Sequence, residues 1–293
     1  MKRLLTIRLS ALGDVIHTIP AVLSLRSAFD VSWVVERPYA ELVQIVTGVS
    51  VIPVRLKKWS LSAILTARDA VRDFDEAIDF QGLIKSALLA WTAAPSRYGF
   101  ARSAVREKPA ALFYNHRIAV DQSKHVVDWN LQLAQALAAN RKPQTANWTA
   151  FPQDAQNRLS TFRHKIVLLP GTGRLEKIWP MERFRELVRR YGDRTLVVWG
   201  PDELNLARAI GGLIAPETNL RELAFILQHA HVVVGGDTGP LHLADALGTR
   251  VVGLYGPTDP ARNGPYGQLQ RTIRHSNSME SITAEEVMRK IEE

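Results

Sequence analysis

The sequence contains no cysteine, which excludes disulfides and thiolate metal sites. Its eight histidines form no HxxxH or HExxH pair, so a zinc enzyme is not expected. No uninterrupted apolar run approaches the ~18 residues that a membrane span requires. The N-terminal Met1-Lys2-Arg3 leads into a short segment with a threonine inside it, unlike a signal peptide. We therefore expect a cytoplasmic globular protein without a bound metal or cofactor.

Two nucleotide-binding signatures are also missing. Neither GxGxxG nor GxxxxGK[ST] occurs, which disfavours dinucleotide redox chemistry and P-loop phosphoryl transfer. One DxD motif, Asp73-Phe74-Asp75, matches the pattern that metal-dependent glycosyltransferases use to hold a cation. It falls before an expected strand and so at that strand's amino end, and we interpret it as solvated loop charge.

The 293 residues suit two domains of ordinary size. Apolar strands alternate with amphipathic helices in both halves, and the pattern dissolves between residues 140 and 153. In the first half we expect strands at 4–9, 31–35, 51–53, 77–80, 97–99 and 117–120, and helices at 15–28, 39–47, 61–71, 83–92 and 126–138. In the second half we expect strands at 166–169, 195–199, 232–234 and 251–254, and helices at 181–191, 202–210, 220–229, 240–247 and 281–292.

This alternation predicts an α/β protein made of two doubly wound, parallel-sheet, Rossmann-like domains. We place the domains at residues 1–152 and 153–293. The last helix either belongs to the second domain or packs back on the first. Ligands of open α/β sheets bind beyond the carboxyl ends of the strands, so the loops there are where functional residues are expected.

The most informative of these loops follows the valine run 232–234. Gly235 and Gly236 lead into Asp237, Thr238 and Gly239, and a helix then begins at a proline. A strand that delivers a helix N-terminus in this way creates a phosphate site, because free backbone N–H groups and the positive end of the helix dipole meet there. His242 lies in the first turn of that helix. The alternative is that Asp237 or Thr238 merely caps the helix.

A similar turn follows the first strand, where Ser10-Ala-Leu-Gly-Asp precedes a helical pattern. Sequence order places Asp14 at the ligand-binding edge of the first sheet. Gly13 suggests that something approaches the backbone closely there. The alternative role for Asp14 is that of an N-cap.

Three more loops follow strands of the second half. In the loop 170–180, glycines permit close approach of a ligand, and Lys177 is placed where a cation could neutralise a diphosphate. In the loop 199–203, Glu203 could accept hydrogen bonds from ribose or sugar hydroxyls, or could simply favour a helix N-terminus. The loop 255–260 is expected to form a wall of the same pocket.

Positive charge is concentrated in the first half of a chain with a formal net charge of +8. A basic face indicates an anionic partner, although it can also be ordinary solvated surface. No nucleic-acid-binding motif accompanies it, so we expect an acidic membrane surface or a phosphorylated acceptor rather than nucleic acid. The candidate acceptor-binding residues are Arg55, Lys57, Lys58, Arg97 and Arg102.

These motifs together resemble those of the bacterial lipopolysaccharide heptosyltransferases, glycosyltransferase family 9, over nearly the whole chain. The matching segments are 10–14 (SALGD), 79–85 (DFQGLIK), 97–100 (RYGF), 113–116 (FYNH), 170–172 (PGT), 177–180 (KIWP) and 236–239 (GDTG) with His242. The region 97–116 is most similar to the type I members. The loop before Lys177 and the short loop 200–203 depart modestly from the family pattern.

The resemblance implies a GT-B fold and an inverting, metal-independent transfer of heptose from ADP-heptose to the Kdo of Kdo-lipid A. It implies that Asp14 is the general base and that Lys177 neutralises the diphosphate. It further implies a donor site of Thr172, Glu203, Asp237, Thr238, Gly239 and His242. A monomer at the cytoplasmic face of the inner membrane, with no cofactor besides its substrates, is the expected form.

Other functions remain open from the sequence. A nucleotide-sugar epimerase or hydrolase of the same fold would turn over the donor without an acceptor. Another sugar transferase of the family would use a different donor sugar. A non-enzymatic binder of anionic lipid would not need Asp14.

Overall fold

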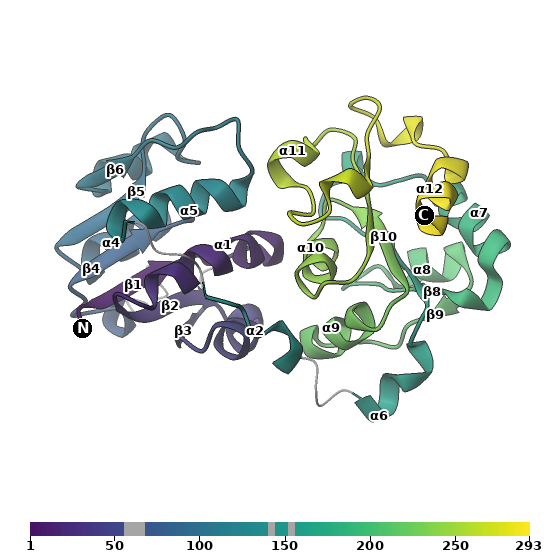
Figure 1. The fold of residues 1–293 in the computed structure, drawn as a ribbon, viewed down its shortest axis with the longest axis horizontal. Coiled ribbons are helices and arrows are strands. Elements are labelled where there is room, and N and C mark those ends of the chain that lie inside the picture. Colours follow the sequence, from purple (N-terminus) through teal and green to yellow (C-terminus); the bar gives the residue numbers. More distant parts are fainter. Residues whose placement is uncertain (56–67, 140–143, 152–155) are drawn as a thin grey trace. The chain divides into compact units, whose positions relative to one another are not determined.

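The computed structural model describes residues 1–55, 68–139, 144–151 and 156–293. These residues form two compact units, Met1–Asn147 and Trp148–Glu293 (Figure 1). The division falls inside the stretch 140–153, where the strand and helix pattern dissolves. Lys57, Lys58 and most of the predicted helix 61–71 lie outside the described residues. No helix within the described ranges is both long and apolar enough to pass through a bilayer.

The first unit contains a parallel six-stranded sheet in the order β3-β2-β1-β4-β5-β6 among its described residues. Its strands are β1 (Arg3–Ile7), β2 (Asp30–Glu36), β3 (Ser50–Val54), β4 (Glu76–Asp79), β5 (Ser96–Phe100) and β6 (His116–Ile118). Its helices are α1 (Leu12–Leu25), α2 (Arg37–Thr47), α4 (Ile84–Ala93) and α5 (Val126–Leu137). A 3₁₀ segment, η1 (Lys108–Phe113), precedes β6.

The second unit contains a parallel six-stranded sheet in the order β12-β11-β10-β7-β8-β9. Its strands are β7 (Ile166–Leu169), β8 (Thr195–Val197), β9 (Leu213–Ile214), β10 (Val232–Gly236), β11 (Val251–Leu254) and β12 (Thr272–Ile273). Its helices are α6 (Gln156–Leu159), α7 (Met181–Tyr191), α8 (Leu204–Ile210), α9 (Leu220–Gln228), α10 (Gly239–Ala246), α11 (Pro260–Asn263) and α12 (Ala284–Glu292). The predicted two doubly wound parallel sheets are therefore confirmed.

Both sheets have the same topology, because numbering the strands of each unit from one to six gives the order 3-2-1-4-5-6 in both. In such a sheet the connections leave the first and fourth strands toward opposite sides, which opens a crevice at the carboxyl ends of these two strands. The crevice lies between β1 and β4 in the first unit and between β7 and β10 in the second. The loops after these four strands carry most of the candidate site residues.

Buried apolar strands and local capping explain why these elements form. All residues of β7, β10 and β11 are buried, as expected for the centre of a parallel sheet covered on both faces. Gly48 ends α2 in the left-handed conformation, with φ of 65°, and its N–H donates to the carbonyl of Gln44. The hydroxyl of Thr283 and the carboxylate of Glu286 form a capping box that starts α12 three residues later than predicted.

The last helix belongs to the second unit's own core. In Figure 1, α12 lies beside α7. Its Val287 and Ile291 are buried with Trp179, Phe184 and Val252 in one apolar cluster. Two short strands, β9 and β12, are absent from the sequence-based prediction because two residues carry no detectable alternation.

Candidate active site

A cavity of about 470 Å³ lies at the carboxyl ends of β7 and β10 in the second unit. Its lining comes from the loops after β7, β8 and β10 and from the first turn of α10. The lining residues are Leu169, Gly171, Thr172, Gly173, Arg174, Lys177, Val198, Trp199, Gly200, Glu203, Leu223, Asp237, Thr238, Gly239 and Pro240. All the predicted donor-site residues except His242 line this cavity. His242 lies behind the lining and contacts it through Asp237.

Lys177, Asp237 and His242 form the polar centre of the cavity wall. The Nζ of Lys177 donates to Oδ2 of Asp237 at 2.7 Å, and Nε2 of His242 lies 3.0 Å from the other carboxylate oxygen. Burial alone would raise the pKa of Asp237, but the hydrogen bonds and charges of His242 and Lys177 outweigh it and lower this pKa to about 2. The carboxylate therefore stays ionised and holds the lysine at the cavity.

The first turn of α10 is open toward a ligand. Thr238 is the N-cap residue, but its hydroxyl makes no capping hydrogen bond. That hydroxyl oxygen is buried and has no partner among the described residues. Asp237 is also not a cap, because both of its oxygens are engaged by Lys177 and His242. The backbone N–H groups of the first turn thus remain available, and this geometry binds phosphate groups.

Glu203 lies over the backbone of the loop that follows β7. A Cβ atom on Gly171 would be 2.0 Å from its carboxylate, so a larger residue there would displace the Glu203 side chain from this position. The same carboxylate accepts a hydrogen bond from the N–H of Gly200 at 2.7 Å. The hydroxyl of Thr172 accepts from the N–H of Arg174 and donates to the same residue's carbonyl. Both predicted residues therefore shape the cavity wall.

The apolar part of the cavity is formed by residues that sequence reasoning did not single out. Val198, Trp199 and Leu223 line it together with Leu169. The indole of Trp199 is fixed by a 2.7 Å hydrogen bond to the carbonyl of Ala215. An apolar wall beside phosphate-binding groups suits a nucleoside. Leu169 and Val198 could not be recognised beforehand, because buried aliphatic residues at strand ends look like ordinary core, and no local pattern shows that the half-buried Trp199 and Leu223 face the same cavity.

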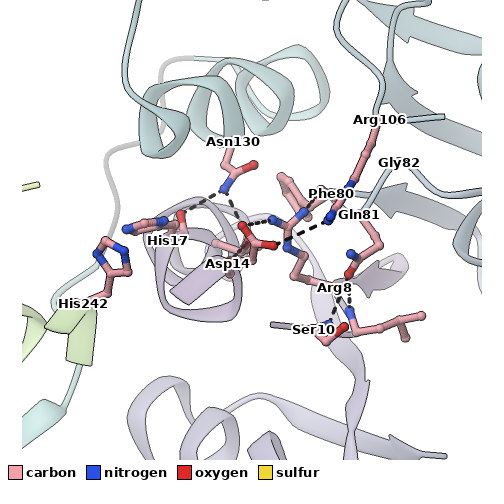
Figure 2. Close-up of polar contacts among 12 residues, drawn as sticks. Arg8, Ser10, Asp14, His17, Phe80, Gln81, Gly82, Arg106, Asn130 and His242 are labelled. Atoms are coloured by element: carbon pink, nitrogen blue, oxygen red, sulfur yellow. Dashed lines mark hydrogen bonds and ion pairs between the residues drawn. The ribbon is translucent and has the colours of Figure 1, made fainter. Parts of the chain in front are cut away.

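In the first unit, Asp14 lies in the first turn of α1 and is held near the carboxyl end of β1 by Arg8, which directly follows that strand (Figure 2). The Arg8 guanidinium lies 2.8 Å from Oδ1 of Asp14, and Arg106 lies 4.0 Å from Oδ2. Asp14 is not the N-cap of α1, since that position is Ala11 and has no side-chain capping bond. About a third of the Asp14 side chain is exposed, whereas Arg8 is almost fully buried.

The loop after β4 supports this arrangement. The side-chain oxygen of Gln81 accepts hydrogen bonds from the N–H groups of Leu9 and Ser10, which ties the loop after β4 to the loop that leads into α1 and Asp14 (Figure 2). Asp79 in turn accepts from the N–H of Gln81 and from the buried hydroxyl of Tyr114. Arg8, Gln81 and Arg106 are functional candidates that sequence reasoning missed. Asp79, Gln81 and Tyr114 lie in the segments that resemble the heptosyltransferases, and this resemblance was the one feature of the sequence that could have marked them as functional.

The structure does not bring all the basic candidates together. Arg55 follows β3, and Arg102 follows β5 in the loop that also carries Arg106, so both are exposed near the carboxyl edge of the sheet. Arg97 instead lies near the amino end of β5, where its guanidinium donates to the backbone carbonyls of Ala94, Pro95 and Phe113. Its role visible in the structure is to tie the start of β5 to η1. Lys57 and Lys58 lie outside the described residues.

Two other sequence expectations can be located. Asp73 and Asp75 lie at the amino end of β4, where they accept hydrogen bonds from the side chain and backbone of Arg3. They are thus on the opposite side of the sheet from the crevice. Among the described residues there is no cluster of three or more His, Asp or Glu side chains that could hold a metal ion.

Two Rossmann-like units, each with charged groups at its topological switch point, define the GT-B class of glycosyltransferases. The second unit offers an open helix N-terminus beside a lysine, and the first offers an oriented carboxylate. Consistent with this, the model of glycosyltransferase family 9 (heptosyltransferase) matches residues 68–292. The chain belongs to this family and is a glycosyltransferase.

Individual relatives agree with this assignment. The chain is 34% identical to lipopolysaccharide heptosyltransferase 1 of Escherichia coli O18:K1:H7, over 99% of this chain and 97% of the relative. Its structure is similar to that of the E. coli heptosyltransferase WaaC with ADP, with a TM-score of 0.83, 30% identity and 99% of each chain covered. The structure of WaaC with ADP-2-deoxy-2-fluoro heptose gives a TM-score of 0.81 at the same identity and coverage.

The lowered pKa of Asp237 predicts a pH-dependent contribution to stability. A folded pKa of about 2 against an unfolded value of about 3.9 corresponds to roughly 2–3 kcal/mol. This stabilisation is complete above the unfolded pKa and is lost as the pH falls through the folded pKa. Asp237→Asn should therefore lower the free energy of unfolding by roughly 2–3 kcal/mol at pH 7, and the deficit should be about half as large at pH 3. Denaturant titrations at stepped pH measure this.

The matched control is Asp193→Asn, which changes an exposed carboxylate of the same unit. It should leave stability within 0.5 kcal/mol or so of the unchanged protein at both pH values. An Asp237→Asn deficit that is absent at pH 7, or that grows toward pH 3, would contradict the assignment.

Proposed function

We propose that this glycosyltransferase moves heptose from ADP-heptose to the Kdo of Kdo-lipid A, with inversion and without a metal ion. The observation that carries the proposal is the second-unit cavity, in which Lys177 and the open first turn of α10 lie beside an apolar wall. This combination suits a nucleoside diphosphate. The similarity to WaaC with ADP and with an ADP-heptose analogue supports the choice of donor.

In the proposed reaction, the acceptor hydroxyl oxygen attacks the anomeric carbon while the bond from that carbon to the diphosphate oxygen breaks. Asp14 takes the proton of the hydroxyl as general base. Lys177 and the N–H groups at Thr238 and Gly239 stabilise the negative charge that develops on the leaving ADP. Because a lysine and a helix N-terminus supply this stabilisation, the proposed mechanism requires no metal ion.

Arg8 has a defined part in this proposal. Its buried guanidinium lies 2.8 Å from one oxygen of Asp14, and the other oxygen lies 4.0 Å from Arg106. The carboxylate is thereby oriented before the acceptor binds, which reduces the reorganisation needed in the transition state. The exposed arginines near the carboxyl edge of the first sheet are proposed to bind acceptor phosphates and carboxylates. The proposed setting is a monomer at the cytoplasmic face of the inner membrane.

The role of Asp14 is tested by Asp14→Asn, which keeps the shape of the side chain and removes its basicity. We expect kcat to fall by ~10²–10⁴ while the Kd for ADP-heptose stays within about twofold. Asp30→Asn, at an exposed position of the same unit, should leave both constants unchanged. A kcat within a few-fold of the parent value would show that Asp14 is not the general base.

The role of Lys177 is tested by Lys177→Ala with ADP as ligand. Loss of a charge-assisted contact should raise the Kd of ADP about tenfold or more, and the effect should be larger at low salt. Lys290→Ala is the control, because this lysine lies on α12 and contacts Glu293 rather than the cavity. Calorimetric titration at two ionic strengths measures the Kd of ADP for both variants. An unchanged Kd for ADP would remove Lys177 from the donor site.

The basic edge of the first sheet is tested with the double variant Arg55→Gln and Arg102→Gln. The KM for the acceptor should rise several-fold and become less sensitive to salt, because exposed charge-assisted contacts are screened by ions. The KM for the donor should not change. Arg72→Gln removes an exposed arginine that pairs with Asp69 and should affect neither constant. If the acceptor KM does not change in the double variant, these arginines are ordinary solvated surface.

A further inference from the structure

A second charged cavity lies at the opposite end of the second sheet from the donor cavity. It has a volume of about 340 Å³. Its lining residues are Arg190, Tyr191, Arg194, His231, Arg250, Ile291 and Glu292. Three arginines and a histidine thus face a single carboxylate.

The cavity arises from the positions of basic residues relative to the strands. Arg194, His231 and Arg250 each come directly before the first residue of a strand, namely β8, β10 and β11. Lys165 and Arg271 occupy the same position before β7 and β12. Because the strands are parallel, all five side chains belong to the amino edge of the sheet, opposite the edge that carries Lys177 and Thr238.

The amino edge also receives the carboxyl ends of the helices, and part of the positive charge serves them. Arg250 donates to the carbonyl of Ile291, Arg271 to that of Lys290, and Lys165 to that of Asp193. These contacts satisfy carbonyls at helix ends, where cations are favourable. They do not account for all the positive charge of the cavity. An arginine that bonds to no carbonyl is not there to stabilise a helix end.

Arg194 is such an arginine. Among the described residues its guanidinium has no carboxylate or carbonyl partner, and it lies 5.8 Å from the centre of the Tyr191 ring. The Nε atom of Arg250 is buried and likewise has no partner in the described part of the chain. Glu292 is engaged by Arg190 at 3.6 Å and by the hydroxyl of Tyr191 at 3.2 Å. Crowding of like charges is also evident at His231, where burial together with Arg250, Arg194 and His164 lowers the pKa.

The first unit provides an internal comparison, because its sheet has the same topology and its helices end at the corresponding edge. The residues directly before its strands are Lys2, Phe29, Val49, Asp75, Pro95 and Asn115. Only the first of these is basic, and one is acidic. The fold therefore does not require the basic edge seen in the second unit.

We propose that this cavity is a second anion site, distinct from the donor site, which binds the phosphate or diphosphate group of a small soluble molecule. Planar guanidinium groups such as those of Arg190 and Arg194 bind phosphate oxygens in pairs. A concave site of this volume suits a compact phosphorylated ligand better than a flat bilayer surface. The aromatic ring of Tyr191 supplies an apolar wall for the ligand's organic part.

The test is calorimetric titration of the full chain with inorganic pyrophosphate, in the presence of saturating ADP and in its absence. We expect binding that persists under saturating ADP and whose Kd rises about tenfold in Arg194→Gln. Arg194→Lys should restore only part of the affinity, since it returns the charge without the planar donor pair. Arg208→Gln, which removes an exposed arginine of α8 outside this cavity, is the matched control and should have no effect.

Two results would overturn the proposal. One is that pyrophosphate does not bind under saturating ADP, or that it binds equally well to the Arg194→Gln variant. The other is that Arg194→Gln abolishes sedimentation with phosphatidylglycerol vesicles but leaves pyrophosphate binding unchanged, which would make this edge a membrane surface. Since the readout is binding of pyrophosphate and not sugar transfer, failure of the proposed heptose transfer would not affect it.

Discussion

The buried ion pair between Lys177 and Asp237 is the contact on which the cavity of the second unit depends. It joins the loop after β7 to the loop after β10, the two loops that border the crevice of the second sheet. Lys177 is 17% exposed and Asp237 is 9% exposed, so the pair is largely removed from water. A buried carboxylate without its partner would be costly, and this couples the position of the cation to the start of α10. His242 occupies the remaining carboxylate oxygen and completes the arrangement.

The same sheet topology serves two different purposes in the two units. In the second unit the crevice ends in an open helix N-terminus and a cation, which suit a leaving diphosphate. In the first unit the corresponding place holds Asp14, whose orientation is fixed by Arg8. The loop that leads into Asp14 is tied to the loop after β4 by Gln81. One crevice therefore offers positive charge and the other a carboxylate. Glycosyl transfer needs both kinds of group, because negative charge leaves one reactant while a proton leaves the other.

Much of the fold could be predicted from the sequence, because buried parallel strands are uninterrupted apolar runs and glycine-rich turns follow them. The strands around residues 166–169, 232–234 and 251–254 were recognisable in this way. The short β9 and β12 were not, since two residues carry no periodic signal. For the site, the positions of the loops after the strands were enough to predict that Lys177, Asp237 and Thr238 lie at one cavity. Gln81 contacts Leu9 and Ser10, and Arg106 contacts Asp14, across more than 70 residues of sequence, and no local pattern contains that information. Arg97 shows the converse, since a basic residue that suggests a ligand instead binds three backbone carbonyls.

The most direct test of the proposed transfer measures ADP release from ADP-heptose with and without deacylated Kdo-lipid A. Our account predicts rapid ADP release only when the acceptor is present, in equal amount to the heptosylated product. Release at the same rate without acceptor would indicate a hydrolase and contradict the account. Conversion of the donor sugar without ADP release would indicate an epimerase and would contradict it equally.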